Sequence, residues 1–203
     1  MEDWKRVIWS DECKINRLGG GGGRWCWKPK GKQQINDRTV QGSIKHGGGS
    51  IMVWGAMTSN GPGYLAKIEG GLNADLYCEI LKDDLMKTIG YYSMDKELII
   101  FQQDNDPKHT SKKAQKCLHE DLELNILPWP AQSPDLNPIE HLWQELKRRL
   151  ASYETYAASM HELWERVQLE WEKFTEDDCM RLIESMPSRI RAVLKAKGGH
   201  TKY

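Results

Sequence analysis

The sequence predicts an α/β fold, a mixed sheet flanked by helices, with additional helices toward the C-terminus. Short apolar segments bounded by turn residues dominate the first half of the chain, as is typical of buried strands. Helical patterns lie between them, and beyond residue 139 only helical patterns remain. This succession favours a mixed sheet with helical cover. Because no internal repeat or domain boundary is evident, we expect one domain over residues 1–203.

Five apolar segments predict the strands. The first stays apolar until it ends in acids, and the third is almost continuously apolar, as a buried strand would be. Five consecutive glycines, residues 19–23, predict a flexible loop before the second strand, and residues 60–63 predict a turn after the third. In chain order the predicted strands are residues 6–12, 24–27, 50–57, 98–104 and 124–127.

Apolar spacing and capping residues predict the helices. Asn73 can cap the first of them, and Gly90 can end it. Thr175, with Asp178 three residues later, predicts a capping box at the start of the last one. The predicted helices are residues 74–89, 109–120, 139–150, 160–174 and 176–187.

Composition places the chain among globular proteins. Hydrophobic residues make up 39% of the chain and 29 basic residues balance 29 acidic ones, which excludes a disordered tail and a histone-like polycation. No apolar run is long enough for a transmembrane helix, so no membrane partner is expected. The five cysteines lack the spacing of zinc ligands and favour a reducing compartment with inert thiols.

Basic residues gather in two segments of this electrically balanced chain. Residues 24–45 carry six basic residues and one acid, and no acid follows Glu184. Such segments suit contact with nucleic-acid phosphates. A solvated protein surface explains them equally well.

Three acids stand at the ends of predicted elements. Asp11 and Asp104 each close an apolar strand, and Glu140 opens an amphipathic helix. Strand and helix ends can converge at one edge of a sheet, where clustered carboxylates repel one another unless a cation lies between them. Oxygen-rich clusters of this kind select Mg²⁺ or Mn²⁺, and a pair of such ions supports phosphodiester chemistry.

Each acid also has a purely structural interpretation. Asp11 is explained as a surface acid at a strand end, and Asp104 as part of the turn sequence Asp-Asn-Asp-Pro. Glu140 falls at the third helical position if Asn137 caps the helix and Pro138 begins it, the usual place of a capping-box glutamate. Periodicity alone leaves the structural and catalytic interpretations open.

Four motifs resemble the catalytic domain of Tc1/mariner-type transposases, in wording closest to the Tc1-like branch. They occur in the family's order and cover the chain from about residue 6 to residue 150. The motifs are Trp-Ser-Asp-Glu at residues 9–12, Lys-His-Gly-Gly-Gly-Ser-Ile-Met-Val-Trp-Gly at 45–55, Gln-Asp-Asn-Asp-Pro-Lys-His at 103–109 and Ser-Pro-Asp-Leu-Asn-Pro-Ile-Glu-His-Leu-Trp at 133–143.

The resemblance implies an RNase H-like fold whose catalytic and metal-binding residues are Asp11, Asp104 and Glu140. It implies that these carboxylates hold two Mg²⁺ ions, for which Mn²⁺ can substitute, and Asp106 is the main rival for the second position. The implied reaction is cut-and-paste transposition. Hydrolysis at a transposon end is followed by attack of the freed 3′-OH on target DNA at a TA dinucleotide. The segment between Asp104 and Glu140 is one residue longer than usual, which a loop absorbs.

The resemblance also implies DNA as the partner, both as terminal inverted repeats and as target. It implies a homodimer in the DNA complex and action in the nucleus. The family's paired helix-turn-helix modules are expected to be absent, since the first catalytic strand lies at the start of the chain. The candidate DNA contacts are Lys45, Gly47, Gly48, Gly49, Lys108 and His109. A hairpin turn explains the glycines equally well, and a helix start explains Lys108 and His109.

Two other functions stay open at this point. One is a transposase-derived module that binds DNA or protein without catalysis, which an intact acidic triad disfavours. The other is a general RNase H-like nuclease that cuts RNA–DNA hybrids. The motifs around Asp104 and Glu140 favour a transposase over that nuclease.

Overall fold

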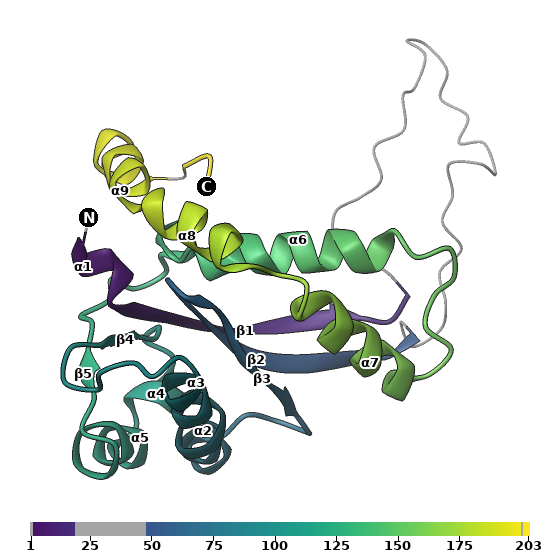
Figure 1. Ribbon diagram of the computed structural model, residues 1–203, viewed down its shortest axis with the longest axis horizontal. Helices are drawn as coiled ribbons and strands as arrows, with labels where there is room; N and C mark the ends of the chain where they lie inside the picture. The colour runs from purple at the N-terminus through teal and green to yellow at the C-terminus, as the bar shows by residue number, and fades with distance from the viewer. Residues whose placement is uncertain (1, 19–47, 200) are drawn as a thin grey trace.

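One mixed sheet forms the centre of the fold (Figure 1). The computed structural model describes residues 2–18, 48–199 and 201–203, so the predicted strand 24–27, the five-glycine segment, Lys45 and Gly47 lie outside the described residues. The strand order is β3-β2-β1-β4-β5. β1 pairs antiparallel with β2 and parallel with β4. The strands are β1 (Val7–Asn16), β2 (Ser50–Thr58), β3 (Gly61–Ile68), β4 (Ile100–Gln102) and β5 (Asn125–Ile126).

Helices cover both faces of this sheet, as the sequence predicts. In Figure 1, α6, α7 and α8 lie against one face and the helices around α2 and α5 lie against the other. The helical elements are α1 (Glu2–Lys5), α2 (Ala74–Ile80), η2 (Leu81–Leu85), α3 (Met86–Tyr91), α4 (Pro107–Thr110), α5 (Lys112–Lys116), η3 (Cys117–Asp121), η4 (Pro134–Leu136), α6 (Ile139–Ala151), α7 (Met160–Trp171), α8 (Glu176–Glu184) and α9 (Met186–Lys195).

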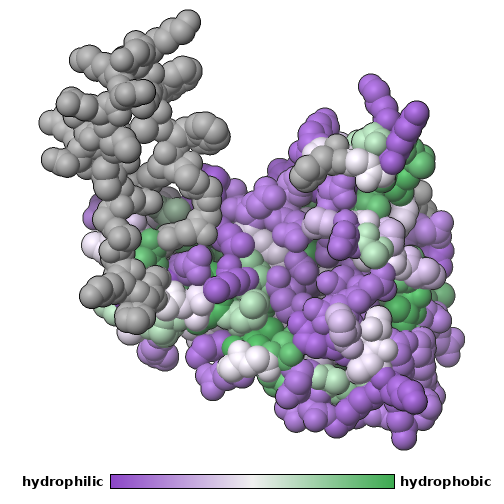
Figure 2. All heavy atoms as spheres, turned by 180° about the vertical axis from the view of Figure 1, so that it is seen from behind, coloured by the Kyte–Doolittle hydropathy of each residue, from purple (hydrophilic) through white to green (hydrophobic). Residues whose placement is uncertain are grey.

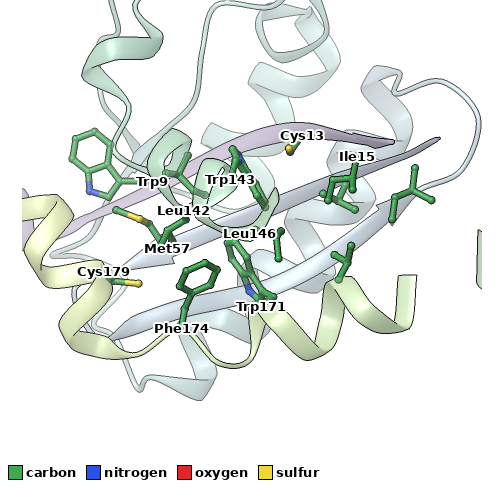
Figure 3. Packing of buried hydrophobic residues seen from close by; sticks show 14 of the residues in the cluster. Trp9, Cys13, Ile15, Met57, Leu142, Trp143, Leu146, Trp171, Phe174 and Cys179 are labelled. Atoms are coloured by element: carbon green, nitrogen blue, oxygen red, sulfur yellow. The ribbon is translucent and has the colours of Figure 1, made fainter. Parts of the chain in front are cut away.

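Alternation along β1 divides its side chains between two hydrophobic cores. Trp9 and Cys13 belong to the core under α6, whereas Ile8 belongs to the core under α2. Figure 3 shows the first of these cores, where Trp143 of α6 stacks on Trp171 of α7 with ring centroids 4.9 Å apart. This packing fixes α6, the helix that carries Glu140, over the middle of β1.

Several predicted boundaries are wrong, each for a local reason. The predicted turn at residues 60–63 is shorter and earlier: the chain turns at Ser59 and Asn60, and Gly61 already begins β3, whose glycines and proline hide a strand pattern. Gly90 does not end its helix, because the chain stays helical to Tyr91 and turns at Ser93, where φ is 48°. The predicted last helix is two helices, α8 and α9, since Pro187 begins a new helix instead of ending the old one.

Other predicted features are confirmed. Asn73 caps α2 by accepting a hydrogen bond from the backbone N–H of Leu76. Thr175 and Asp178 form the expected capping box of α8. Four cysteines lie in the described part of the chain, and all four are buried free thiols.

One face of the molecule is mainly polar. The face in Figure 2 is largely hydrophilic, with hydrophobic residues in small separate patches. Within the described residues, no helix combines the length and the apolar character that a membrane crossing requires.

Candidate active site

Asp11 lies in the middle of the central strand. The sequence predicts that the first strand closes at Asp11 and Glu12, but β1 continues to Asn16. Asp11 lies opposite Gly55 of β2. The side chain of Asp11 points to the α6 face, where the indole Nε1 of Trp143 donates to its Oδ2 at 3.2 Å. Its neighbour Glu12 points to the opposite face, as alternation requires.

Asp104 follows the strand next to β1. β4 runs parallel to β1 and pairs with residues 7–9, so the residues that follow β4 lie beside Asp11. Two hydrogen bonds join Ser10 to Gln102, of 3.2 Å and 2.8 Å, and hold this edge together. Asp104 then lies in a turn, where its Oδ1 accepts from the backbone N–H of Asp106 at 3.0 Å.

Glu140 is the second residue of α6, which confirms that it opens an amphipathic helix. The side chain of Asn137 donates to the carbonyl of Ser10 at 3.1 Å and accepts from the N–H of Ile139 at 3.4 Å. Asn137 therefore ties the start of α6 to β1 beside Asp11. Within the described part of the chain, no capping hydrogen bond involves the Glu140 carboxylate, so the capping-box interpretation fails and this side chain stays available to the pocket.

These three acids line one pocket of about 400 Å³. The pocket lies between the turn after β4, the loop before α6 and the middle of β1. Its lining residues are Asp11, Asp104, Asn105, Asp106, Trp129, Pro130, Ala131, Gln132, Ser133, Pro134, Asn137 and Glu140. Three segments that are far apart in the sequence thus bring the predicted triad to a single place.

The electrostatics of Asp11 reflect this convergence. Burial, followed by the negative charges of Glu140, Glu12 and Asp104, raises its pKa to about 8. A carboxyl group this perturbed lacks a compensating positive charge. Such a group at the wall of a pocket marks a candidate functional site.

The pKa of Asp104 is shifted in the opposite direction, because its carboxylate contacts His109. The Nδ1 of His109 lies 2.6 Å from Oδ1 of Asp104, and its Nε2 lies 3.3 Å from Oε1 of Glu12, without the alignment of a hydrogen bond. The hydrogen bond from His109 lowers the pKa of Asp104. Burial alone would lower the pKa of His109, but its contacts with Asp104 and Glu12 raise it to about 9. The protonated imidazole therefore anchors Asp104.

His109 is itself held in the core. Its side chain is 3% exposed, and its ring lies 4.1 Å from the ring of Tyr77, whose hydroxyl donates to Gln103 at 2.6 Å. This buried placement is not the surface position that contact with DNA phosphate would need, so His109 is a positioning residue for Asp104. Lys108 pairs with Asp106 at 3.1 Å and keeps a partly exposed side chain.

The donor set fits a hard divalent cation. Three carboxylates beside one pocket offer the oxygen ligands that Mg²⁺ and Mn²⁺ prefer, and the charges of Glu140 and Asp104 add to burial in raising the pKa of Asp11. In the part of the chain that the structure describes, however, no three acidic, histidine or cysteine side chains stand close enough to bind a single ion. The three carboxylates therefore line the same pocket but lie too far apart to bind one ion together.

The described glycines of the Gly-rich motif have a structural role. Gly48 and Gly49 have φ values of 70° and 86°, which side chains other than glycine rarely adopt. Their carbonyls accept hydrogen bonds from Arg17, at 2.6 Å from its Nε and at 3.0 Å from its backbone N–H. These two glycines thus hold the start of β2 against Arg17, next to the end of β1, and contact between them and DNA stays a prediction.

Sequence reasoning missed four residues that support the site. Glu12 and Tyr77 surround His109, Trp143 contacts Asp11, and Arg189 contacts the loop before Glu140. Glu12 is the one with a signal in the sequence, since a second acid beside Asp11 must point to the other face of the strand. The others depend on contacts between distant segments.

Comparison with known proteins agrees with this geometry. Residues 6–163 match the family described as DDE superfamily endonuclease. The chain is 39% identical over 201 residues to the transposable element Tcb1 transposase of Caenorhabditis briggsae, covering 99% of this chain and 71% of that protein. It is 38% identical over 202 residues to the transposable element Tc1 transposase of Caenorhabditis elegans, covering 100% of this chain and 72% of that protein.

Solved structures show the same fold at lower identity. The Mos1 transposase paired-end complex with left transposon end matches with a TM-score of 0.80 and 20% identity, over 98% of this chain and 57% of that chain. The Mos1 paired-end complexes with Mn and with Mg and the Mos1 strand transfer complex match with TM-scores of 0.80, 0.78 and 0.79. The sheet with its flanking helices is therefore RNase H-like, and the chain belongs to the DDE superfamily endonucleases, as a Tc1/mariner-type transposase catalytic domain.

Proposed function

We propose that this chain cleaves DNA at transposon ends and transfers the freed strand into target DNA. The observation that carries the proposal is the convergence of Asp11, Asp104 and Glu140 on one pocket. Burial of Asp11, together with the nearby acids, raises its pKa to about 8. The chain spans 57% of the Mos1 chain in its paired-end complex, so recognition of terminal repeats, pairing of two ends in a dimer, a TA target and action in the nucleus are part of the proposal.

Each acid has a distinct role in the proposed site. Asp11, on the rigid central strand and held by Trp143, is the proposed ligand shared by two ions. Asp104, kept ionised by His109, and Glu140, at the start of α6, each favour one of the two ions. When bound, two divalent ions activate the attacking oxygen and stabilise the leaving oxygen. Support for divalent cations comes from the oxygen donor set and from the Mn and Mg complexes of Mos1.

The same pocket serves both proposed steps. Its acids and the loop over residues 129–134 leave a space of about 400 Å³, open to the phosphate group of a DNA strand. In the first step water attacks the scissile phosphate, and in the second the strand's 3′-OH takes the place of water. Both reactions break one P–O bond and form another, so one set of residues suffices.

Nicking of supercoiled plasmid in Mg²⁺ or Mn²⁺ tests the proposal. We expect Asp11→Asn, Asp104→Asn and Glu140→Gln each to lower the nicking rate by about 100-fold or more, because each removes a metal-binding charge. Glu145→Gln is the matched control, since Glu145 lies on the same helix but pairs with Arg148 away from the pocket.

Three outcomes would contradict the proposal. Loss of nicking in Asp106→Asn but not in Asp104→Asn would give the second catalytic position to Asp106. Preferential cutting of the RNA strand in RNA–DNA hybrids would indicate a general RNase H-like nuclease. DNA binding by the wild-type chain without any cation-dependent cleavage would indicate a module without catalysis.

A further inference from the structure

A buried arginine outside the acidic pocket contacts the loop that leads to Glu140. Arg189 of α9 is 1% exposed, and its guanidinium donates to the hydroxyl of Ser185 at 2.8 Å and to the carbonyl of Asp135 at 2.9 Å. It also lies 2.9 Å from Nδ1 of His141. A buried charge is costly unless its hydrogen bonds are satisfied. Arg189 is therefore not one of the surface cations that the basic C-terminal segment predicts, but a connection between α9, this loop and α6.

The last residues of the chain add to this connection. The hydroxyl of Thr201 donates to Oδ2 of Asp135 at 2.9 Å. The ring of Tyr203 lies 4.8 Å from the Arg189 guanidinium and 6.4 Å from the ring of His141. Stacking of a guanidinium on an aromatic ring stabilises both groups, more so when they are removed from water. We call Arg189, Thr201 and Tyr203 the C-terminal clasp.

The clasp and the central strand hold the same short loop. Residues 133–137 form a tight turn in which the N–H of Asn137 donates to the carbonyl of Pro134 at 3.0 Å. The clasp contacts this turn at Asp135, and Asn137 joins it to the carbonyl of Ser10 at 3.1 Å. The N–H of Glu140 donates to the carbonyl of Asn137 at 3.3 Å. The position of Glu140 thus depends on a loop attached to β1 and to the C-terminal clasp.

We propose that the C-terminal clasp positions Glu140 for metal binding, with Arg189 as the central positioning residue. The inference rests on the proposed function of Glu140 as a ligand. Among the residues that the structure describes, the clasp contacts Asp135 and His141 near the site, but neither Asp11 nor Asp104. Loss of the clasp therefore loosens one ligand and leaves the other two in place. Partners that orient metal ligands typically change metal affinity by about 10–100-fold when mutated.

The test compares Arg189→Lys and Thr201→Val with the control Arg191→Ala in the full chain. Lysine keeps the charge of Arg189 but cannot reach Asp135 and His141 with a planar fork, and valine keeps the shape of Thr201 without its hydroxyl. Arg191 lies on the same helix, is exposed, and its side chain bonds to Ser188 within the described part of the chain. The measurements are amide hydrogen exchange in residues 133–140 and Mn²⁺ affinity by calorimetry.

We expect exchange in residues 133–140 to accelerate about tenfold in both clasp variants while the strands stay protected, since local openings report local stability. Mn²⁺ affinity should fall by about tenfold, and Arg191→Ala should match the wild type in both measurements. Thr201→Val keeps the test decisive if Arg189→Lys fails to fold. If Thr201→Val and any folded Arg189→Lys match the wild type in hydrogen exchange and in Mn²⁺ affinity, the proposed role of the clasp is overturned. A wild-type chain that binds no Mn²⁺ would instead overturn the proposed function and, with it, the role of Glu140.

Discussion

At the scale of single residues, folding strongly raises the pKa of Asp11 in the candidate site. Burial and the charges of Glu140, Glu12 and Asp104 raise its pKa from 3.8 to about 8. An acid whose pKa is raised by folding stabilises the folded state fully below its unfolded pKa. That contribution is lost as the pH rises through the folded pKa. Without metal, Asp11 therefore lowers the free energy of unfolding progressively between about pH 4 and pH 8.

The variant Asp11→Asn tests this, because it keeps the shape of the side chain and removes its charge. In EDTA we expect the variant to be more stable than the wild type at pH 8 by about 1 kcal/mol or more, which is about 2–4 °C in Tm for a chain of this size. The difference should shrink toward pH 4, as thermal unfolding at several pH values will show. Glu145→Gln is the control, because its hydrogen bond with Arg148 lowers the pKa of Glu145 to about 2. A lowered pKa stabilises the folded state above the unfolded pKa, so this variant should be less stable than the wild type at pH 8. A stability difference for Asp11→Asn that does not vary with pH would contradict the argument.

At the scale of elements, the contact between β2 and α6 sets the position of Asp11. Gly55 lies opposite Asp11 in the sheet, and a Cβ atom there would come within 2.6 Å of Cη2 of Trp143. Trp143 is 1% exposed and donates its indole N–H to Asp11. The glycine that ends the Gly-rich motif, Gly55, is thus explained by the need for a strand residue without a side chain beneath α6.

Gly55→Ala should displace Trp143 and weaken its hydrogen bond to Asp11. We expect a loss of about 1–3 kcal/mol in the free energy of unfolding, the usual cost of overpacking a core, and a lower Mn²⁺ affinity. Denaturant unfolding and calorimetry measure the two effects. Gly90→Ala is the control, because a Cβ there meets no atom within 4 Å and Gly90 lies in a helix, where alanine is the better residue. Equal stability of the two variants would contradict the steric argument.

At the scale of the whole molecule, the proposed ions would add a further link between three segments that are far apart in the sequence, namely β1, the turn after β4 and the start of α6. Binding to the folded state alone stabilises the protein by mass action. Mn²⁺ at 100 times its Kd should stabilise the wild type by about 2.7 kcal/mol, which is about 5–10 °C in Tm. The same addition should leave Asp104→Asn and Glu140→Gln nearly unchanged. An equal increase in all three proteins would place the ion outside the acidic pocket.

The sequence predicted the elements with strong local signals and missed those without them. Asn73 and Thr175 were found because a cap acts within its own helix turn. β3 was missed because its first residues, Gly61 and Pro62, are also turn residues. The phosphate-contact hypothesis for His109 did not anticipate its burial, because the helix pattern of residues 109–120 does not reveal the packing of Tyr77 and Glu12 against its ring.

By itself, the sequence determined the fold class, the order of most elements, the family and the three acids that converge on the pocket. These follow from motifs and periodicities that are properties of contiguous residues. Only the tertiary structure decided that Trp143 contacts Asp11, that His109 anchors Asp104 and that Arg189 is buried beside the Glu140 loop. Those outcomes depend on contacts between segments that folding brings together, and no local pattern records such contacts.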